Sequence, residues 1–132
     1  MPTDVTLDDL ADEKFVSLTT FRKNGIGVPT PVWVGRDRDA LVVTTPVGSG
    51  KVKRLRNNPT VELRPCSRRG TVDDGAPTVT ARAEVVEGPD AMRRLDEVFR
   101  PKYSLEYRIV MGIERLLRRG SPQRVMLRIT PA

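Results

Sequence analysis

Three stretches with the composition of β-strands follow one another near the start of the chain, and only short turns separate them. The predicted strands are 14–21, 28–35 and 40–45, and the predicted turns are 22–27 and 36–39. The first turn contains Asn-Gly, which favours a tight connection between antiparallel strands. Pro29 and Pro31 cannot donate to a strand ladder, so the second strand is expected at a sheet edge or at a bulge. This region therefore predicts an antiparallel meander.

The rest of the chain adds three further strands and four helices to this meander. The strands are predicted at 60–67, 78–88 and 123–131, and the helices at 7–13, 50–57, 89–103 and 104–120. A chain of 132 residues suits one domain, spanning 1–132. Six short, mostly antiparallel strands with helices at the ends predict an α+β fold built on a small barrel, because closure removes exposed sheet edges. Such a barrel has a narrow core, so a ligand is expected outside it, between two chains.

The residues that are missing exclude several kinds of chemistry. The sequence has no histidine and one cysteine, Cys66, which excludes histidine-based catalysis, an internal disulfide and a cysteine-based metal cluster. No catalytic side chain and no metal site are therefore predicted. No apolar run approaches the roughly 20 residues of a membrane span, and the acidic N-terminus does not resemble a signal peptide. We expect a cytoplasmic protein without a membrane partner.

Positive charge is concentrated in one segment. The chain has a net charge of +6, and residues 51–69 carry seven basic side chains against one acidic residue, Glu62. The basic residues are Lys51, Lys53, Arg54, Arg56, Arg64, Arg68 and Arg69. This concentration indicates an anionic partner, the alternative being a solvated basic face. Only 5% of the residues are aromatic and none alternates with these bases, so nucleic-acid binding is not favoured.

The segment TTPVGSGKVKRLRNNPTVEL, residues 44–63, suggests where that anion binds. Its Gly-Lys pair opens a helix, where free backbone N–H groups attract anions. A P-loop would need glycine at position 45 and a hydroxyl at position 52, but the chain has Thr45 and Val52, so an ATPase or GTPase is disfavoured. Lys51 opposes the dipole of the predicted helix, and such a violation of local preference favours a phosphate-binding role.

Three blocks of the sequence carry a resemblance to a known family. They are LTTFRKNGIGVPTPVWV, VTTPVGSGKVKRLRNNPTVEL and ARAEVVEGPD. Together they resemble the pyridoxamine-phosphate-oxidase-like split β-barrel superfamily, in particular the actinobacterial branch of oxidoreductases that depend on deazaflavin (coenzyme F420). The likeness runs from about residue 11 to 130. It implies a six-stranded, mostly antiparallel split β-barrel with flanking helices, of the kind that binds FMN.

The resemblance also implies a homodimer with a cofactor in each groove between the subunits. The cofactor would supply the hydride chemistry for a small unsaturated or quinone-like substrate, and the protein would hold it. The resemblance also assigns ten residues by position. The family's phosphate cradle matches Ser49, Gly50 and Lys51, and the same helix continues with Lys53 and Arg56. The phosphate and ribityl chain would lie beside Thr44 and Thr45, and the ring system would lie beside Pro31, Val32 and Trp33. The acidic tail of F420 suits the basic segment, while FMN and a non-catalytic cofactor carrier remain the alternatives.

Overall fold

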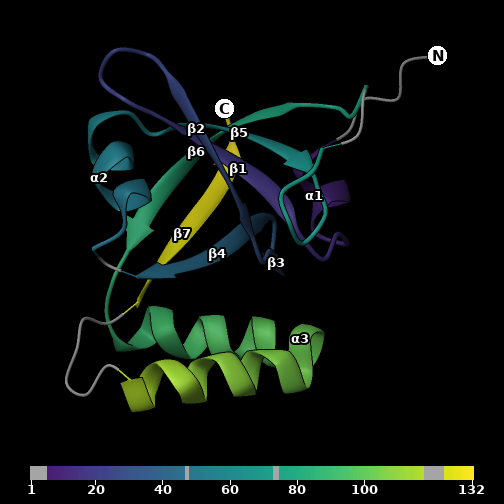
Figure 1. Ribbon diagram of the computed structural model, residues 1–132, viewed down its shortest axis with the longest axis vertical. Helices are drawn as coiled ribbons and strands as arrows, with labels where there is room; N and C mark the ends of the chain where they lie inside the picture. Colours follow the sequence, from purple (N-terminus) through teal and green to yellow (C-terminus); the bar gives the residue numbers. More distant parts are fainter. Residues whose placement is uncertain (1–5, 47, 73–74, 118–123) are drawn as a thin grey trace.

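The computed structural model is built on one curled antiparallel sheet with helices packed around it (Figure 1). It describes residues 6–46, 48–72, 75–117 and 124–132, and of the side chains between 104 and 117 only those of Leu105 and Ile109. The strands are β1 (Val16–Phe21), β2 (Gly27–Val32), β3 (Gly35–Asp37), β4 (Ala40–Pro46), β5 (Thr60–Pro65), β6 (Val79–Val86) and β7 (Arg124–Pro131). The helices are α1 (Leu7–Leu10), α2 (Gly50–Asn57) and α3 (Pro89–Leu117). The predicted α+β split barrel is confirmed.

Within the described residues, the sheet has seven strands in the order β2-β1-β5-β6-β7-β4-β3, so its two edge strands are consecutive in the chain. The two edge strands are not hydrogen-bonded neighbours, and the barrel is open along this seam rather than closed. The prediction that the second strand lies at an edge is confirmed. Pro29 and Pro31 of β2 face Thr19 and Ser17 of β1 in the register, and no strand in the described part of the chain pairs with the other side of β2.

The predicted strand count of six is wrong by one, because part of the predicted second turn is β3. Asp37 pairs with Ala40 across a two-residue loop in which Arg38 has a φ of 60°. The charged run at 36–39 indicated an exposed turn, yet Asp37 is only 4% exposed. Its carboxylate is held by Arg94 of α3 and Arg128 of β7, which lie far along the chain. A buried charge is stable when it is paired in this way, and local sequence does not reveal the partners.

The first hairpin and α1 follow their local signals. Gly25 has a φ of 88°, and its N–H donates to the carbonyl of Arg22 at 2.8 Å, which closes the predicted Asn-Gly turn. The predicted N-cap Thr6 forms a capping box with Asp9, whose carboxylate accepts from the Thr6 N–H at 2.9 Å. The helix itself is shorter than predicted and ends at Leu10.

Two apolar clusters lie on the two faces of the sheet. The first fills the inside of the curl with side chains from six strands, α1 and α2. The second packs α3 against the outer face of β4 and β7 and contains Ala91, Leu95, Phe99 and Tyr103, spaced four residues apart on one face of the helix. In Figure 1 α3 lies below the sheet, along the side where these strands run.

The described parts of the two predicted helices, 89–103 and 104–120, fall within one helical element of the structure, α3. Pro101 lies inside it, which removes one backbone donor from the helix. Figure 1 shows that the element doubles back, so that two arms run side by side. The predicted end at 118–120 and the residue 123 lie outside the described residues. No helix among the described residues is long and apolar enough to cross a membrane.

Candidate functional site

A pocket of about 250 Å³ brings together residues from five separate segments of the chain, the first being Phe15 just before β1. It lies where β2 and β4 end, where β7 begins and where α2 makes its first turn. The lining residues are Phe15, Pro31, Val32, Trp33, Thr44, Thr45, Pro46, Lys51 and Arg124. Six of the ten predicted cofactor-binding residues are among them. Whether they bind a cofactor stays a prediction, but the fold places them around one space.

One of the two cations that line the pocket, Lys51, follows the connection from β4 to α2. The N–H of Ser49 donates to the carbonyl of Pro46 at 3.0 Å, and the hydroxyl of Thr45 donates to that of Ser49 at 3.0 Å. Ser49 is the N-cap residue, yet its side chain makes no capping hydrogen bond. The first-turn N–H groups of α2 therefore lack a side-chain cap and can face an anion.

Lys51 is a half-buried cation of the pocket lining. Burial lowers the pKa of Lys51 from its ordinary value of 10.5, and the nearby charges of Arg54 and Arg124 lower it further. Among the described residues, no hydrogen bond or ion pair reaches its ammonium group, and no acidic residue lines the pocket. An anion bound here would offset both the burial and the repulsion between these cations.

Arg124 is a lining residue that the sequence analysis missed. Its Nε donates to the hydroxyl of Thr44 at 3.0 Å, and Nη2 donates to the carbonyl of Thr44 at 3.3 Å. The two residues are 80 positions apart, and the pairing of β4 with β7 brings them together by placing Pro46 opposite Arg124. No local signal identifies Arg124. Phe15, inside the first predicted strand, and Pro46, directly after the third, also line the pocket and were not predicted to do so.

The pocket lining also contains apolar and aromatic side chains. Trp33 stacks on the ring of Tyr103, with centroids 4.7 Å apart and planes 20° from parallel. Val32 is 8% exposed, and Phe15, directly before β1, is half-buried. A planar apolar ring fits beside such residues better than a charged or strongly hydrated group, because apolar walls stabilise a ligand by removing its apolar surface from water.

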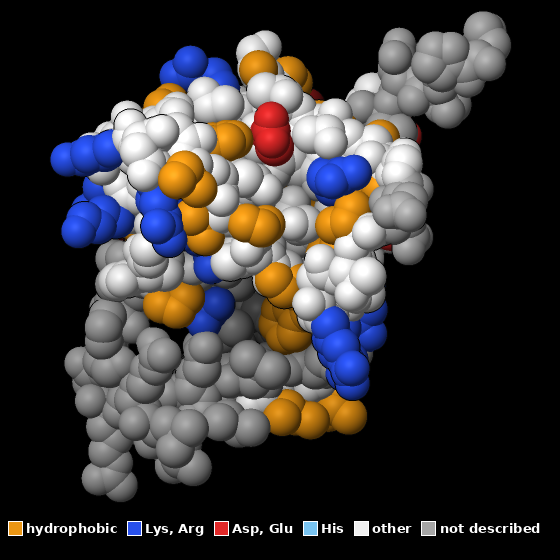
Figure 2. Space-filling view, turned by 45° about the horizontal axis from the view of Figure 1, so that its top comes forward, with side chains coloured by type: hydrophobic (Ala, Val, Ile, Leu, Met, Phe, Trp, Pro, Cys, Tyr) orange, Lys and Arg blue, Asp and Glu red, His pale blue; other side chains and the backbone are white. Residues whose placement is uncertain are grey.

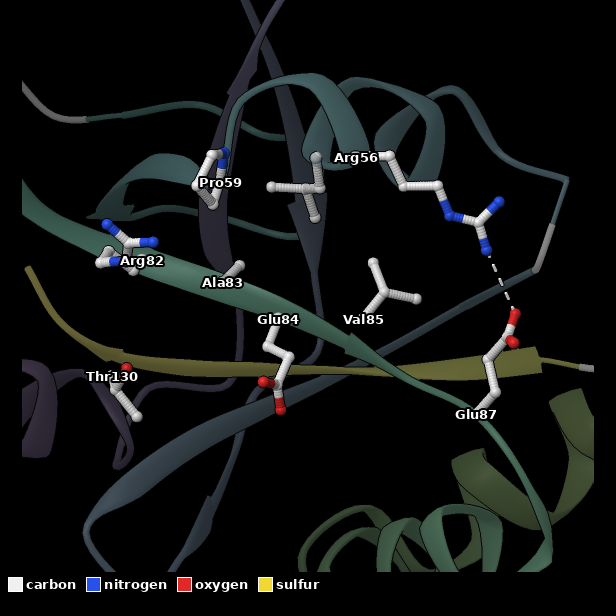
Figure 3. Close-up of a pocket in the computed structure, with 9 residues that line it drawn as sticks. Arg56, Pro59, Arg82, Ala83, Glu84, Val85, Glu87 and Thr130 are labelled. Atoms are coloured by element: carbon white, nitrogen blue, oxygen red, sulfur yellow. Dashed lines mark hydrogen bonds and ion pairs between the residues drawn. The ribbon is translucent and has the colours of Figure 1, made fainter.

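The four remaining predicted residues do not line this pocket. Ser49 and Gly50 lie at the start of α2 next to it, and Lys53 is exposed on the same helix. Arg56 points to a different groove of about 470 Å³ between α2 and β6, where its guanidinium pairs with Glu87 at 3.3 Å. Figure 3 shows this ion pair, with Val85 projecting toward α2 and Glu84 pointing away from it.

The basic segment is also divided by the fold. Arg54 donates to the hydroxyl of Thr20 at 2.6 Å, whereas Arg64 donates to the carbonyl of Ala76 at 3.0 Å and supports the loop that follows β5. Arg68 lies 6.0 Å from the ring centroid of Phe15. Figure 2 shows the Lys and Arg side chains in several separate groups on one face, rather than as one patch.

A curled antiparallel sheet that is open along one seam, with a pocket at the start of the helix after β4, defines a split β-barrel. The chain belongs to the pyridoxamine 5'-phosphate oxidase family, whose model matches residues 3–132. A search of curated proteins finds no significant match.

Solved structures share the same fold. A conserved hypothetical protein from Mycobacterium tuberculosis matches with a TM-score of 0.67 and 22% identity, over 95% of this chain and 77% of that one. An F420 reductase matches with a TM-score of 0.58 and 17% identity, over 100% of this chain and 96% of that one. A FAD-binding protein from Mesorhizobium loti matches with a TM-score of 0.60 and 13% identity, over 92% and 82%. At these identities the likeness shows the fold.

Proposed function

We propose that the protein is a deazaflavin (coenzyme F420)-dependent oxidoreductase that transfers a hydride between the cofactor and a small unsaturated or quinone-like substrate. One observation carries the proposal. A single pocket is lined both by the aromatic side chains of Trp33 and Phe15 and by the cationic side chains of Lys51 and Arg124. A flavin-type cofactor combines a planar ring with an anionic arm, which suits these two kinds of lining. The match to an F420 reductase over the whole chain supports F420 as the cofactor.

The residues present fit such a cofactor. Lys51, Arg124 and the first-turn N–H groups of α2 would hold the phosphate, while Thr44 and Thr45 would lie beside the chain that joins it to the ring. Pro31, Val32 and Trp33 would flank the ring. The bound cofactor supplies the hydride chemistry, so the task of the protein is to orient it and exclude water from its ring.

We also propose that the working unit is a homodimer. The pocket in one chain encloses about 250 Å³, which is less than the roughly 300–1,000 Å³ of typical small-molecule sites. A second copy placed over the open side would complete the walls. Light scattering on the purified protein tests this, with a dimer expected and a monomer at the concentrations that bind cofactor contradicting it.

Titration of the purified protein with F420 and, separately, with FMN tests the cofactor. We expect micromolar or tighter binding of F420, weaker binding of FMN, and a loss of about ten- to hundred-fold in affinity for both in Lys51→Ala, because a charge-assisted hydrogen bond to phosphate is lost. Lys23→Ala is the matched control, since Lys23 is exposed in the β1–β2 turn. Unchanged affinity in Lys51→Ala would remove Lys51 from the site.

FMN dependence is the main alternative, and one observation favours it. Arg56 already pairs with Glu87, so the fold uses one of the bases expected to bind the acidic tail of F420. The comparison of Lys53→Ala with the parent protein separates the two cofactors. If the tail binds along α2, this change weakens F420 and leaves FMN unaffected. A non-catalytic carrier would bind F420 without oxidising or reducing any quinone-like substrate in rapid-mixing experiments.

A further inference from the structure

The short connection between β2 and β3 is held by Tyr103 of α3. The N–H of Val34 donates to the Tyr103 hydroxyl at 3.0 Å. The same hydroxyl can donate to the carbonyl of Lys14 at 2.7 Å or to that of Val34 at 3.0 Å. Gly35 follows directly, and a Cβ atom there would lie 2.9 Å from Cε1 of Phe99. This corner of the open barrel therefore packs closely against α3.

The adjacent residue, Lys102, ties the same corner to the N-terminal segment. Its ammonium group donates to the carbonyls of Ala11 at 2.7 Å, Glu13 at 2.6 Å and Val34 at 2.7 Å. An ammonium group has three N–H donors, and all three have acceptors here. Although much of the Lys102 side chain is exposed, its charged end links three backbone segments.

These hydrogen bonds flank both aromatic residues of the pocket. Glu13 and Lys14 immediately precede Phe15, and Val34 immediately follows Trp33. The Tyr103 ring also stacks on Trp33, and the edge of Phe99 packs against Tyr103 with centroids 5.6 Å apart. Neither Lys102 nor Tyr103 lines the pocket, so any effect on a ligand must pass through the residues they hold.

We propose that Lys102 and Tyr103 are positioning residues that set the placement of Phe15 and Trp33, and with it the fit of the pocket to a planar ring. The identity of that ring as part of a flavin-type cofactor rests on the proposed function. The ordinary alternative is that the pair only stabilises the contact between α3 and the sheet. A purely stabilising role predicts that any loss of stability weakens the binding of a ring-bearing ligand. A positioning role predicts that only the loss of these hydrogen bonds weakens it.

Tyr103→Phe is the main variant, because it keeps the ring that stacks on Trp33 and removes the hydroxyl that binds Val34 and Lys14. The probes are FMN and ribitol 5-phosphate, which has the phosphate arm without the ring. We expect FMN affinity to fall about ten-fold and ribitol 5-phosphate affinity to change less than about two-fold, since small displacements of positioning groups affect only the contacts they orient. An equal fall for both probes, or no change in FMN affinity, would overturn the proposal.

Leu95→Val is the stability control. Leu95 is 2% exposed in the same core between α3 and the sheet, and its apolar side chain makes none of the hydrogen bonds that hold the two segments, so the loss of one methylene lowers stability and leaves those bonds in place. We expect its FMN affinity to match the parent protein, and a loss equal to that of Tyr103→Phe would overturn the proposal. Lys102→Met removes the other group that holds these segments and leaves the aromatic stack in place. It is tested by the same comparison of FMN with ribitol 5-phosphate affinity.

A readout without any ligand separates this inference from the proposed function. Trp33 is the single tryptophan of the chain, so its fluorescence reports directly on the pocket wall. In the ligand-free protein, acrylamide should quench Trp33 more strongly in Tyr103→Phe than in the parent protein or in Leu95→Val. Equal quenching in all three would overturn the positioning role. Absence of F420 and FMN binding in the parent protein would overturn the cofactor proposal and leave the quenching test intact.

Discussion

Replacement of Asp37 by asparagine should destabilise the protein through the junction of β3, β7 and α3. The Asp37 carboxylate is 5% exposed and receives Arg94 at 2.6 and 2.8 Å and Arg128 at 3.1 Å. Removal of one partner from a fully buried ion pair costs about 3–5 kcal/mol. Here the arginine side chains are 43% and 32% exposed, so each keeps part of its hydration after the change. We therefore expect a loss of about 2 kcal/mol at pH 7, in the range of hydrogen bonds to charged groups.

The loss should depend on pH in a defined direction. The hydrogen bond from Arg94 is the largest influence on the pKa of Asp37 and lowers it below its ordinary value of 3.8, with Arg128 adding to this and burial opposing it. The folded pKa is thus below the unfolded pKa. The carboxylate contributes its stability above the unfolded value, and that contribution is lost as the pH falls through the folded value. The difference between parent and variant should therefore be largest near pH 7 and shrink in acid.

Urea unfolding followed by circular dichroism at pH 7 and at about pH 3 measures both quantities. Asp39→Asn is the matched control, because Asp39 is an exposed carboxylate in the same turn. It should leave the free energy of unfolding within about 0.5 kcal/mol of the parent value. A loss below about 0.5 kcal/mol for Asp37→Asn at pH 7, or a loss of equal size at both pH values, would refute the assigned role of this carboxylate.

Three further predictions follow from other parts of the structure. Affinity for a phosphate-bearing ligand should fall as the pH rises through the lowered pKa of Lys51, because only the ammonium form attracts the anion, and Lys51→Arg should remove this dependence in titrations between pH 7 and 10. Gly35→Ala should lower the free energy of unfolding by about 1–3 kcal/mol, since its Cβ would press on Phe99, whereas Gly48→Ala, with nothing within 4 Å, should not; chemical unfolding compares them. Arg38→Gly should raise the melting temperature, because it relieves about 1 kcal/mol of strain at a φ of 60°; an unchanged or lower value contradicts this.

Features that depend on neighbouring residues were predictable. Helix α2 begins and ends where the Gly-Lys pair and the Asn-Pro step placed it, at Gly50 and Asn57. The prolines of β2 identified a sheet edge, since a residue without an N–H cannot serve a ladder on both sides. The Asn-Gly turn and the Thr6 cap were likewise local. In each case the governing interaction spans only a few residues.

Features that depend on distant residues were not predictable in the same way. Strand β3 looked like a turn because the two arginines that neutralise Asp37 lie 57 and 91 residues away. Arg124 joined the pocket only through the pairing of β7 with β4. Arg56 and Arg64 belong to the basic segment, but Arg56 forms an ion pair with Glu87 and Arg64 donates to the carbonyl of Ala76.

The amino-acid sequence by itself determined six of the strands, one edge of the sheet and the start of α2 beside a lysine, because short-range sterics and backbone hydrogen bonding govern all of these. Only the tertiary structure decided which of the seven clustered bases meet the aromatic wall. That choice depends on the curl of the sheet and on strand pairing across some 80 residues, where Thr44 meets Arg124. The number of basic residues follows from the sequence, but the place to which each basic side chain points depends on packing.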